Sequence, residues 1–108
     1  MSSEREFDQI FKALSDARRR RILDLLKTRP QTTGEICSEF PELDRCTVMQ
    51  HLDVLERSRL LIRKKEGRHR WNYLDVVPLR EIYERWIDPL TSPAVDVLSR
   101  LRRDLEEK

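Results

Sequence analysis

Residues 44–55 read DRCTVMQHLDVL, and the spacing of the apolar residues in this stretch decides the fold. Val48, Leu52 and Leu55 recur at helical intervals and form a narrow apolar stripe. At about 100° per residue, the side chains that point away from the stripe are those of Cys46, Gln50, Asp53 and Arg57, with Thr47 and Met49 beside them. We therefore predict a helix that packs on a small core through one side and presents polar side chains on the other.

Three further helices are predicted before this one. The first ends near Ser15 and has apolar residues at positions i, i+3, i+4 and i+7, which are Phe7, Ile10, Phe11 and Leu14. Asp16 can cap a second helix, and Thr33 can cap a short third one. Asp44 can cap the fourth, so a tight turn of about 3–4 residues joins the third helix to the fourth. This arrangement predicts a helix-turn-helix at about residues 33–59.

The pattern becomes β-like after Arg59. The runs LLIRKKE and RHRWNYLD flank Gly67 and are rich in residues that favour strands. They predict a β-hairpin, or wing, at about residues 60–75, with a basic tip. One face of this hairpin can hold Ile62, Trp71 and Tyr73.

Two more helices are predicted at about residues 78–107, starting at Pro78. The apolar stripe of the fifth helix is too wide for the small core left to receive it, and it consists of Leu79, Ile82, Tyr83, Trp86 and Leu90. The sixth helix is marked by Val95, Leu98, Leu101 and Leu105. We expect residues 1–108 to form a single winged helix-turn-helix domain, mainly α with a small β-hairpin.

Charge is distributed unevenly along the chain. The net charge is only +2, but residues 57–70 hold seven basic residues and one acid, a local charge of +6, which leaves −4 for the rest. The seven are Arg57, Arg59, Arg63, Lys64, Lys65, Arg68 and Arg70. This asymmetry favours a polyanionic partner that meets one edge of the molecule.

Several other classes of protein are disfavoured by the sequence. No apolar run approaches the ~20 residues of a membrane span and the N-terminus lacks the apolar core of a signal peptide, so we expect a cytoplasmic protein without membrane contact. Cys37 and Cys46 are too few for a disulfide framework and are expected to be free thiols. There is no glycine-rich phosphate loop, nucleophile elbow or HExxH motif, so we expect neither an enzyme nor a cofactor.

The presented side of the fourth helix has the chemistry to read double-stranded DNA. In a helix-turn-helix, the N-terminal residues of the second helix reach base edges in the major groove. Gln50 can pair with adenine, Thr47 can contact several base edges, and Arg45 can reach guanine or a phosphate. Arg57 lies further along and suits a phosphate. In the wing, the candidates for phosphate or minor-groove contact are Lys64, Lys65, Arg68 and Arg70.

Three residues of the same helix have more than one interpretation. Asp53 can accept a hydrogen bond from cytosine or pair with Arg57, and the sequence does not decide between them. His51 borders the apolar stripe and is either packed or bonded to a phosphate. Cys46 is expected in the groove beside Arg45, where it is either a small residue that the interface tolerates or a thiol whose thiolate the helix dipole favours.

Taken in order, the segments FKALSDARRRRILDLLK, TGEICSEF and CTVMQHLDVLERSRLLIRKKEGRHRWNYL resemble the ArsR-type winged-helix regulators of bacteria, over residues 5–90 or so. The resemblance implies a homodimer that binds an inverted-repeat operator and represses transcription, with recognition helices about 34 Å apart. It also implies that the first and fifth helices form the dimer interface, with Phe7, Ile10, Phe11, Leu79, Ile82, Tyr83, Trp86 and Leu90 as candidates.

Many members of that family sense metals, but the ligands do not match here. The segment EICSEF supplies Cys37 and places Glu39 where a second cysteine is needed, and LREIYERW contains no histidine. We therefore expect no metal site. Two alternatives to the repressor remain open: a winged helix that binds a protein partner without DNA, and a thiol-responsive repressor that uses Cys46.

Overall fold

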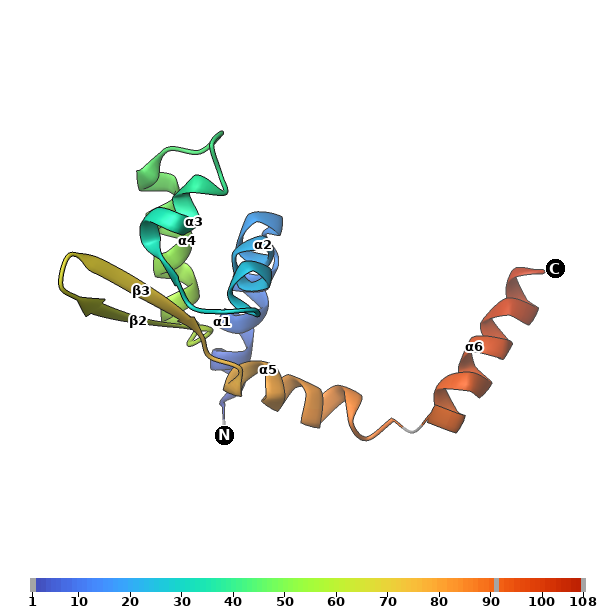
Figure 1. Ribbon diagram of the computed structural model, residues 1–108. Helices are drawn as coiled ribbons and strands as arrows, with labels where there is room; N and C mark the ends of the chain where they lie inside the picture. The colour runs from blue at the N-terminus through green and yellow to red at the C-terminus, as the bar shows by residue number, and fades with distance from the viewer. Residues whose placement is uncertain (1, 91, 108) are drawn as a thin grey trace. The chain divides into compact units, whose positions relative to one another are not determined.

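The computed structural model describes residues 2–90 and 92–107 (Figure 1). The chain forms two compact units that divide between Pro78 and Leu79. The first unit holds the helix-turn-helix and the wing, and the second holds most of the C-terminal helices. Within the described residues, no helix combines the length and the apolar composition that crossing a membrane requires.

Four helices build the first unit: α1 (Glu4–Leu14), α2 (Ala17–Leu26), α3 (Thr33–Ser38) and α4 (Arg45–Arg57). The predicted caps of α2 and α4 are confirmed, since Asp16 accepts a hydrogen bond from the backbone of Arg18 and Asp44 from that of Thr47. The predicted cap of α3 is wrong by one residue. Thr32 caps this helix, and Thr33 is buried in its first turn.

The sheet has three antiparallel strands in the order β1-β3-β2. The predicted hairpin is confirmed as β2 (Leu61–Glu66) and β3 (His69–Leu74), and its tip projects away from the helices of this unit (Figure 1). The turn depends on Gly67, whose φ of +61° lies in the left-handed region that glycine tolerates. β1 (Gln31–Thr32) was not predicted, because two residues are too short to show a period of two.

The core of the first unit lies between the four helices and the base of the sheet. Val48, Leu52 and Leu55 are each 0% exposed, which confirms the apolar stripe of α4. The other buried apolar residues are Phe7, Ile10, Ala13, Ile22, Leu23, Leu26, Ile36, Phe40, Leu60 and Leu61. Asn72 is also fully buried, and its amide donates to the Gln31 carbonyl and the Thr33 hydroxyl. This amide therefore ties β3 to both β1 and α3.

The C-terminal elements are α5 (Val77–Ile82), a π-helical segment η1 (Tyr83–Ile87) and α6 (Ser92–Glu106). The predicted start of the fifth helix at Pro78 is correct to within one residue, and the change to π-helix at Tyr83 was not predicted. Large apolar side chains remain exposed on all three elements. On α6 they include Val95, Leu98, Leu101 and Leu105.

Candidate nucleic-acid interface

The N-terminal half of α4 presents the polar side chains that its angular spacing predicts. Arg45, Cys46 and Gln50 are exposed and Thr47 is half-buried, while the apolar stripe on the other side of the helix is fully buried. The bond from the Thr47 backbone to the Asp44 carboxylate lowers the pKa of Asp44 and keeps this acid ionised. Arg45 and Gln50 are thus free to contact a partner from a helix whose first turn is well capped.

A basic hollow of about 560 Å³ lies where α3, the start of α4 and the wing meet. Its lining residues are Thr32, Thr33, Gly34, Glu35, Ser38, Arg45, Arg68, His69 and Arg70. Glu35 is the one acid among them, and it is held by Arg29 at 2.7 Å, a contact that lowers the pKa of Glu35. Three arginines from two elements therefore line a surface where an anionic group would be the complementary ligand.

The hairpin register sorts the basic residues of the wing onto two faces. Lys65 is opposite Arg70 and Arg63 is opposite Asn72, so these side chains share the face that packs toward the helices. Lys64 is opposite Trp71 on the other face, and its amino group lies 3.2 Å from Glu66. Of the two neighbouring lysines, Lys65 therefore lies on the face that packs toward the helices, and Lys64 lies on the opposite face.

Arg63 joins the wing to α4. One nitrogen of its guanidinium, Nη2, lies 2.6 Å from Asp53 and 2.7 Å from Glu56, and the side chain is only 17% exposed. The hydrogen bond to Glu56 is the main cause of the raised pKa of Arg63. Asp53 therefore pairs with Arg63 and not with Arg57, while its contact with cytosine stays a prediction. Sequence analysis missed this role, although strand alternation puts Arg63 on the same face as the buried Leu61.

His51 is not among the presented residues, and its assignment to DNA contact is corrected. Its side chain is buried, 7% exposed, and Nδ1 lies 3.3 Å from an Arg19 nitrogen. Because arginine only donates, Nδ1 must accept, which assigns the proton to Nε2. Burial lowers the pKa of His51 despite the nearby Asp16 carboxylate. The physical reason is that His51 borders the apolar stripe of α4 on the side where α2 packs. Of the two interpretations of His51, packing and phosphate contact, the structure supports packing.

Arg57 is exposed at the end of α4, as expected, and lines a second hollow with α1 and α2. Lys64, Lys65, Arg68 and Arg70 are all exposed on the wing. Among the described residues no group of three His, Cys, Asp or Glu side chains is placed to hold a metal ion. Cys37 is half-buried and Cys46 is exposed, and both are free thiols.

The predicted dimer residues divide into two sets. Phe11, Tyr83, Trp86 and Leu90 are exposed, and Leu79 and Ile82 are half-buried. Phe7 and Ile10 are only 6% and 2% exposed in their own chain. Their assignment is corrected, because a side chain that the core of its own unit already covers has almost no surface left for a partner.

Comparison with known proteins agrees with this arrangement. The Helix-turn-helix domain family model matches residues 14–63. The transcriptional repressor SdpR of Bacillus subtilis is 31% identical over 74 residues, covering 68% of this chain and 81% of the repressor. The regulator Rv2034 of Mycobacterium tuberculosis is 36% identical over 98 residues, covering 87% and 91%.

A solved structure, that of the ArsR family transcriptional regulator RHA00566, superposes with a TM-score of 0.69 at 25% identity and covers 99% of this chain and 96% of that one. The chain is thus a winged helix-turn-helix of the transcription-regulator class. It belongs to the ArsR family of transcriptional regulators.

Proposed function

We propose that this protein is a homodimeric repressor that binds an inverted-repeat operator through α4 and the wing. The observation that carries the proposal is the basic hollow, where Arg45, Arg68 and Arg70 converge beside the presented side of α4. A phosphate of the duplex backbone fits the chemistry of this hollow, and such a contact would orient α4 in the major groove.

Base readout is assigned to the exposed first half of α4. Gln50 can form a bidentate pair with adenine, and Thr47 can meet a thymine methyl or a base edge. Lys65 and Arg70 would neutralise phosphates from the wing, and Arg57 would do so from the end of α4. Cys46 lies among these residues and gives the interface one exposed thiol.

Dimerisation is assigned to the second unit, from Leu79 onward, with a contribution from Phe11. Both η1 and α6 expose several large apolar side chains, and clusters of such side chains mark interfaces between protein chains. A twofold axis would place two α4 helices on successive turns of the duplex, about 34 Å apart. Repression is proposed because SdpR, a relative at 31% identity, is a repressor.

DNA binding is tested by fluorescence anisotropy with duplex from upstream of the protein's own gene and with scrambled duplex, across several salt concentrations. Gln50→Ala is expected to reduce the preference for one sequence by about 1–3 kcal/mol. Lys65→Ala should lower the salt slope by about one ion. Lys64→Ala is the matched control, because it removes the same charge from the adjacent residue on the opposite face, and it should leave the slope unchanged.

Equal effects of the two lysine variants would contradict the assigned orientation of the wing. If the native protein bound neither duplex more tightly than any basic surface does, DNA readout would be refuted. The alternative of a winged helix that binds a protein partner would then be favoured. Dimerisation is tested separately by sedimentation equilibrium. Leu98→Glu is expected to yield monomers, whereas Ser99→Glu adds the same charge next to the apolar stripe and should leave a dimer.

A further inference from the structure

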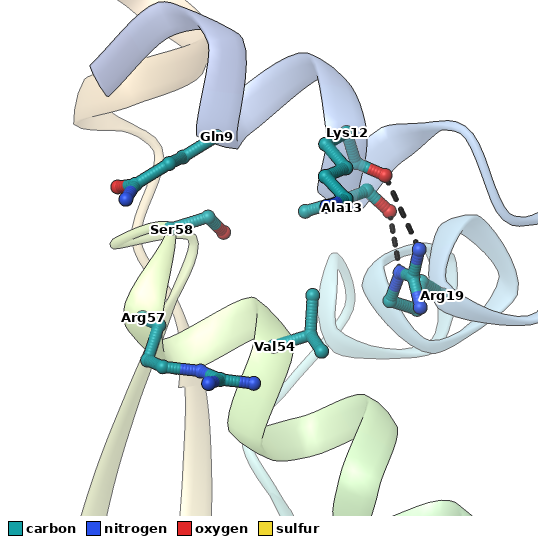
Figure 2. Close-up of a pocket in the computed structure, with 7 residues that line it drawn as sticks. All are labelled: Gln9, Lys12, Ala13, Arg19, Val54, Arg57 and Ser58. Atoms are coloured by element: carbon teal, nitrogen blue, oxygen red, sulfur yellow. Dashed lines mark hydrogen bonds between the residues drawn. The ribbon is translucent and has the colours of Figure 1, made fainter. Parts of the chain in front are cut away.

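A second hollow, of about 310 Å³, lies between α1, α2 and α4 (Figure 2). It is lined by Gln9, Lys12, Ala13, Arg19, Val54, Arg57 and Ser58. All seven residues belong to the first unit, so the hollow is complete within one chain. Ala13 and Val54 give it apolar lining, and the others bring polar or charged groups. Its volume is within the range of sites that bind small molecules.

The charges around this hollow have one sign. Lys12, Arg19 and Arg57 line it from three different helices, and none of its lining residues is an acid. Several acids on or next to the surrounding helices pair with arginines that do not line the hollow: Asp16 with Arg18, Glu6 with Arg59, and Asp53 and Glu56 with Arg63. Three cations thus line a hollow that has no carboxylate among its lining residues, which favours the binding of an anion.

One of the three cations is held in place before any ligand binds. Arg19 donates from Nε to the Ala13 carbonyl at 2.7 Å and from Nη2 to the Lys12 carbonyl at 3.2 Å, as Figure 2 shows. Its Nη1 lies 3.3 Å from His51. A guanidinium has five N–H donors, so two remain for a ligand after these three contacts. Fixing this group in advance lowers the entropic cost of binding.

We propose that this hollow binds a small anion carrying a phosphate or carboxylate group, with Lys12, Arg19 and Arg57 as the cationic contacts. Arg19 offers its two remaining N–H donors to the anion, and Lys12 and Arg57 add their positive charges from α1 and α4. Gln9 can donate a further hydrogen bond, and the apolar lining of Ala13 and Val54 accommodates a short carbon skeleton. The proposal concerns the free protein and does not depend on DNA binding.

The site can also influence the proposed function. Arg57 belongs to the helix that we assign to base readout, and a bound anion would neutralise it and link the end of α4 to α1. This consequence rests on the proposed function, whereas the binding itself does not. The first experiment therefore measures binding to the protein alone.

The experiment is a titration followed by ¹H–¹⁵N correlation spectra of the labelled full chain. Inorganic phosphate and malonate are the two probes, and chloride holds the ionic strength constant. We expect saturable shifts of the Ala13, Val54 and Ser58 amides with at least one probe. Lys12→Gln and Arg57→Gln should each weaken that binding by about tenfold.

Lys27→Gln is the matched control. It removes one positive charge from α2 at a residue that pairs with Asp24 and does not line the hollow, so binding should be unchanged. All three substitutions are at exposed side chains, so the variants are expected to fold. Arg19 is left intact because it joins α1 to α2.

Three outcomes would overturn the proposal. Shifts that match those produced by chloride alone would mean simple screening. Shifts confined to Arg45, Arg68 and Arg70 would place the anion in the other hollow. A third arm adds a short duplex, and if duplex shifts the Ala13 and Val54 amides while neither free probe does, the hollow takes a DNA phosphate and not a small ligand.

Discussion

Arg63 provides a quantitative test of how the wing is held against α4. Its guanidinium makes two charge-assisted hydrogen bonds, at 2.6 Å to Asp53 and 2.7 Å to Glu56. We consider the substitution Arg63→Met, which keeps a long apolar stem and removes the charge. The two carboxylates would then remain one turn apart on α4 with no cation between them.

The expected cost follows from the burial of the three groups. Hydrogen bonds to charged groups contribute about 1.5–3 kcal/mol each when buried, and exposed ion pairs about 0.2–1 kcal/mol. Arg63 is 17% exposed but its partners are 51% and 44% exposed, so each bond belongs near the boundary of these ranges, at about 1 kcal/mol. Water can solvate the freed carboxylates, which limits the loss. We expect Arg63→Met to lower the free energy of unfolding by about 1–2 kcal/mol.

The assay is urea unfolding followed by circular dichroism, arranged as two double-mutant cycles. One cycle pairs Arg63→Met with Glu56→Gln and the other pairs it with Asp53→Asn. Each cycle should give a coupling energy of about 0.5–1 kcal/mol, and salt should reduce it. Arg80→Met, at a highly exposed pair with Glu84, is the control and should change stability by less than about 0.5 kcal/mol.

Coupling energies within about 0.2 kcal/mol of zero in both cycles would refute the reasoning. The wing would then depend on the sheet alone for its position, and the two short distances would contribute nothing to stability. A loss as large in the Arg80 control would also refute it, because the effect would come from net charge and not from these contacts.

Three further predictions address burial and chemistry elsewhere. Asn72→Ala removes the amide hydrogen bonds to the Gln31 carbonyl and the Thr33 hydroxyl from a fully buried residue, so it should lower the free energy of unfolding by about 2–3 kcal/mol in urea titrations. A loss under about 0.5 kcal/mol would contradict the role of this amide in joining β1, β3 and α3. Burial lowers the pKa of His51 below its unfolded value of 6.5, so its contribution to stability is present above that pH and is lost as pH falls through the lowered pKa. His51→Gln should therefore reduce the loss of unfolding free energy between about pH 7 and pH 5. An unchanged dependence of the unfolding free energy on pH would exclude His51 as its cause. Cys46 is exposed and Cys37 is half-buried, so a thiol reagent should modify Cys46 at least about tenfold faster than Cys37. Cys46→Ser should abolish the fast phase of the reaction. A single phase in which both thiols react equally fast would contradict these exposures.

Features set by neighbouring residues were predicted from the sequence, and features set by distant contacts were not. The caps at Asp16 and Asp44 depend on backbone two or three residues away, so the sequence was sufficient for them. The sequence was not sufficient to choose between Thr32 and Thr33 as the cap of α3. Either threonine can cap α3, and what separates them is that the Thr33 hydroxyl accepts from Asn72, 39 residues later.

The same division holds within the candidate interface. The angular spacing of α4 was enough to predict that Arg45 and Gln50 are presented. The packing of His51 depends on Arg19, 32 residues earlier, and the pairing of Asp53 depends on Arg63, ten residues later. Charge composition alone marked the wing as basic. It could not say which face each cation takes, because that requires the strand register.

The strand register therefore determines both which ion pairs stabilise the wing and which face each of its cations occupies. The turn at Gly67 sets Glu66 opposite His69, and this pairing places Arg63 and Lys65 on the α4 side of the hairpin. A one-residue slip would move every side chain of one strand to the other face. If β2 slipped by one residue, Arg63 would leave its two carboxylates and Lys65 would move to the opposite face of the hairpin. The ion pairs of Arg63 thus oppose a slip that would move Lys65 to the other face, so a residue paired with α4 would help to determine where the wing's charges lie.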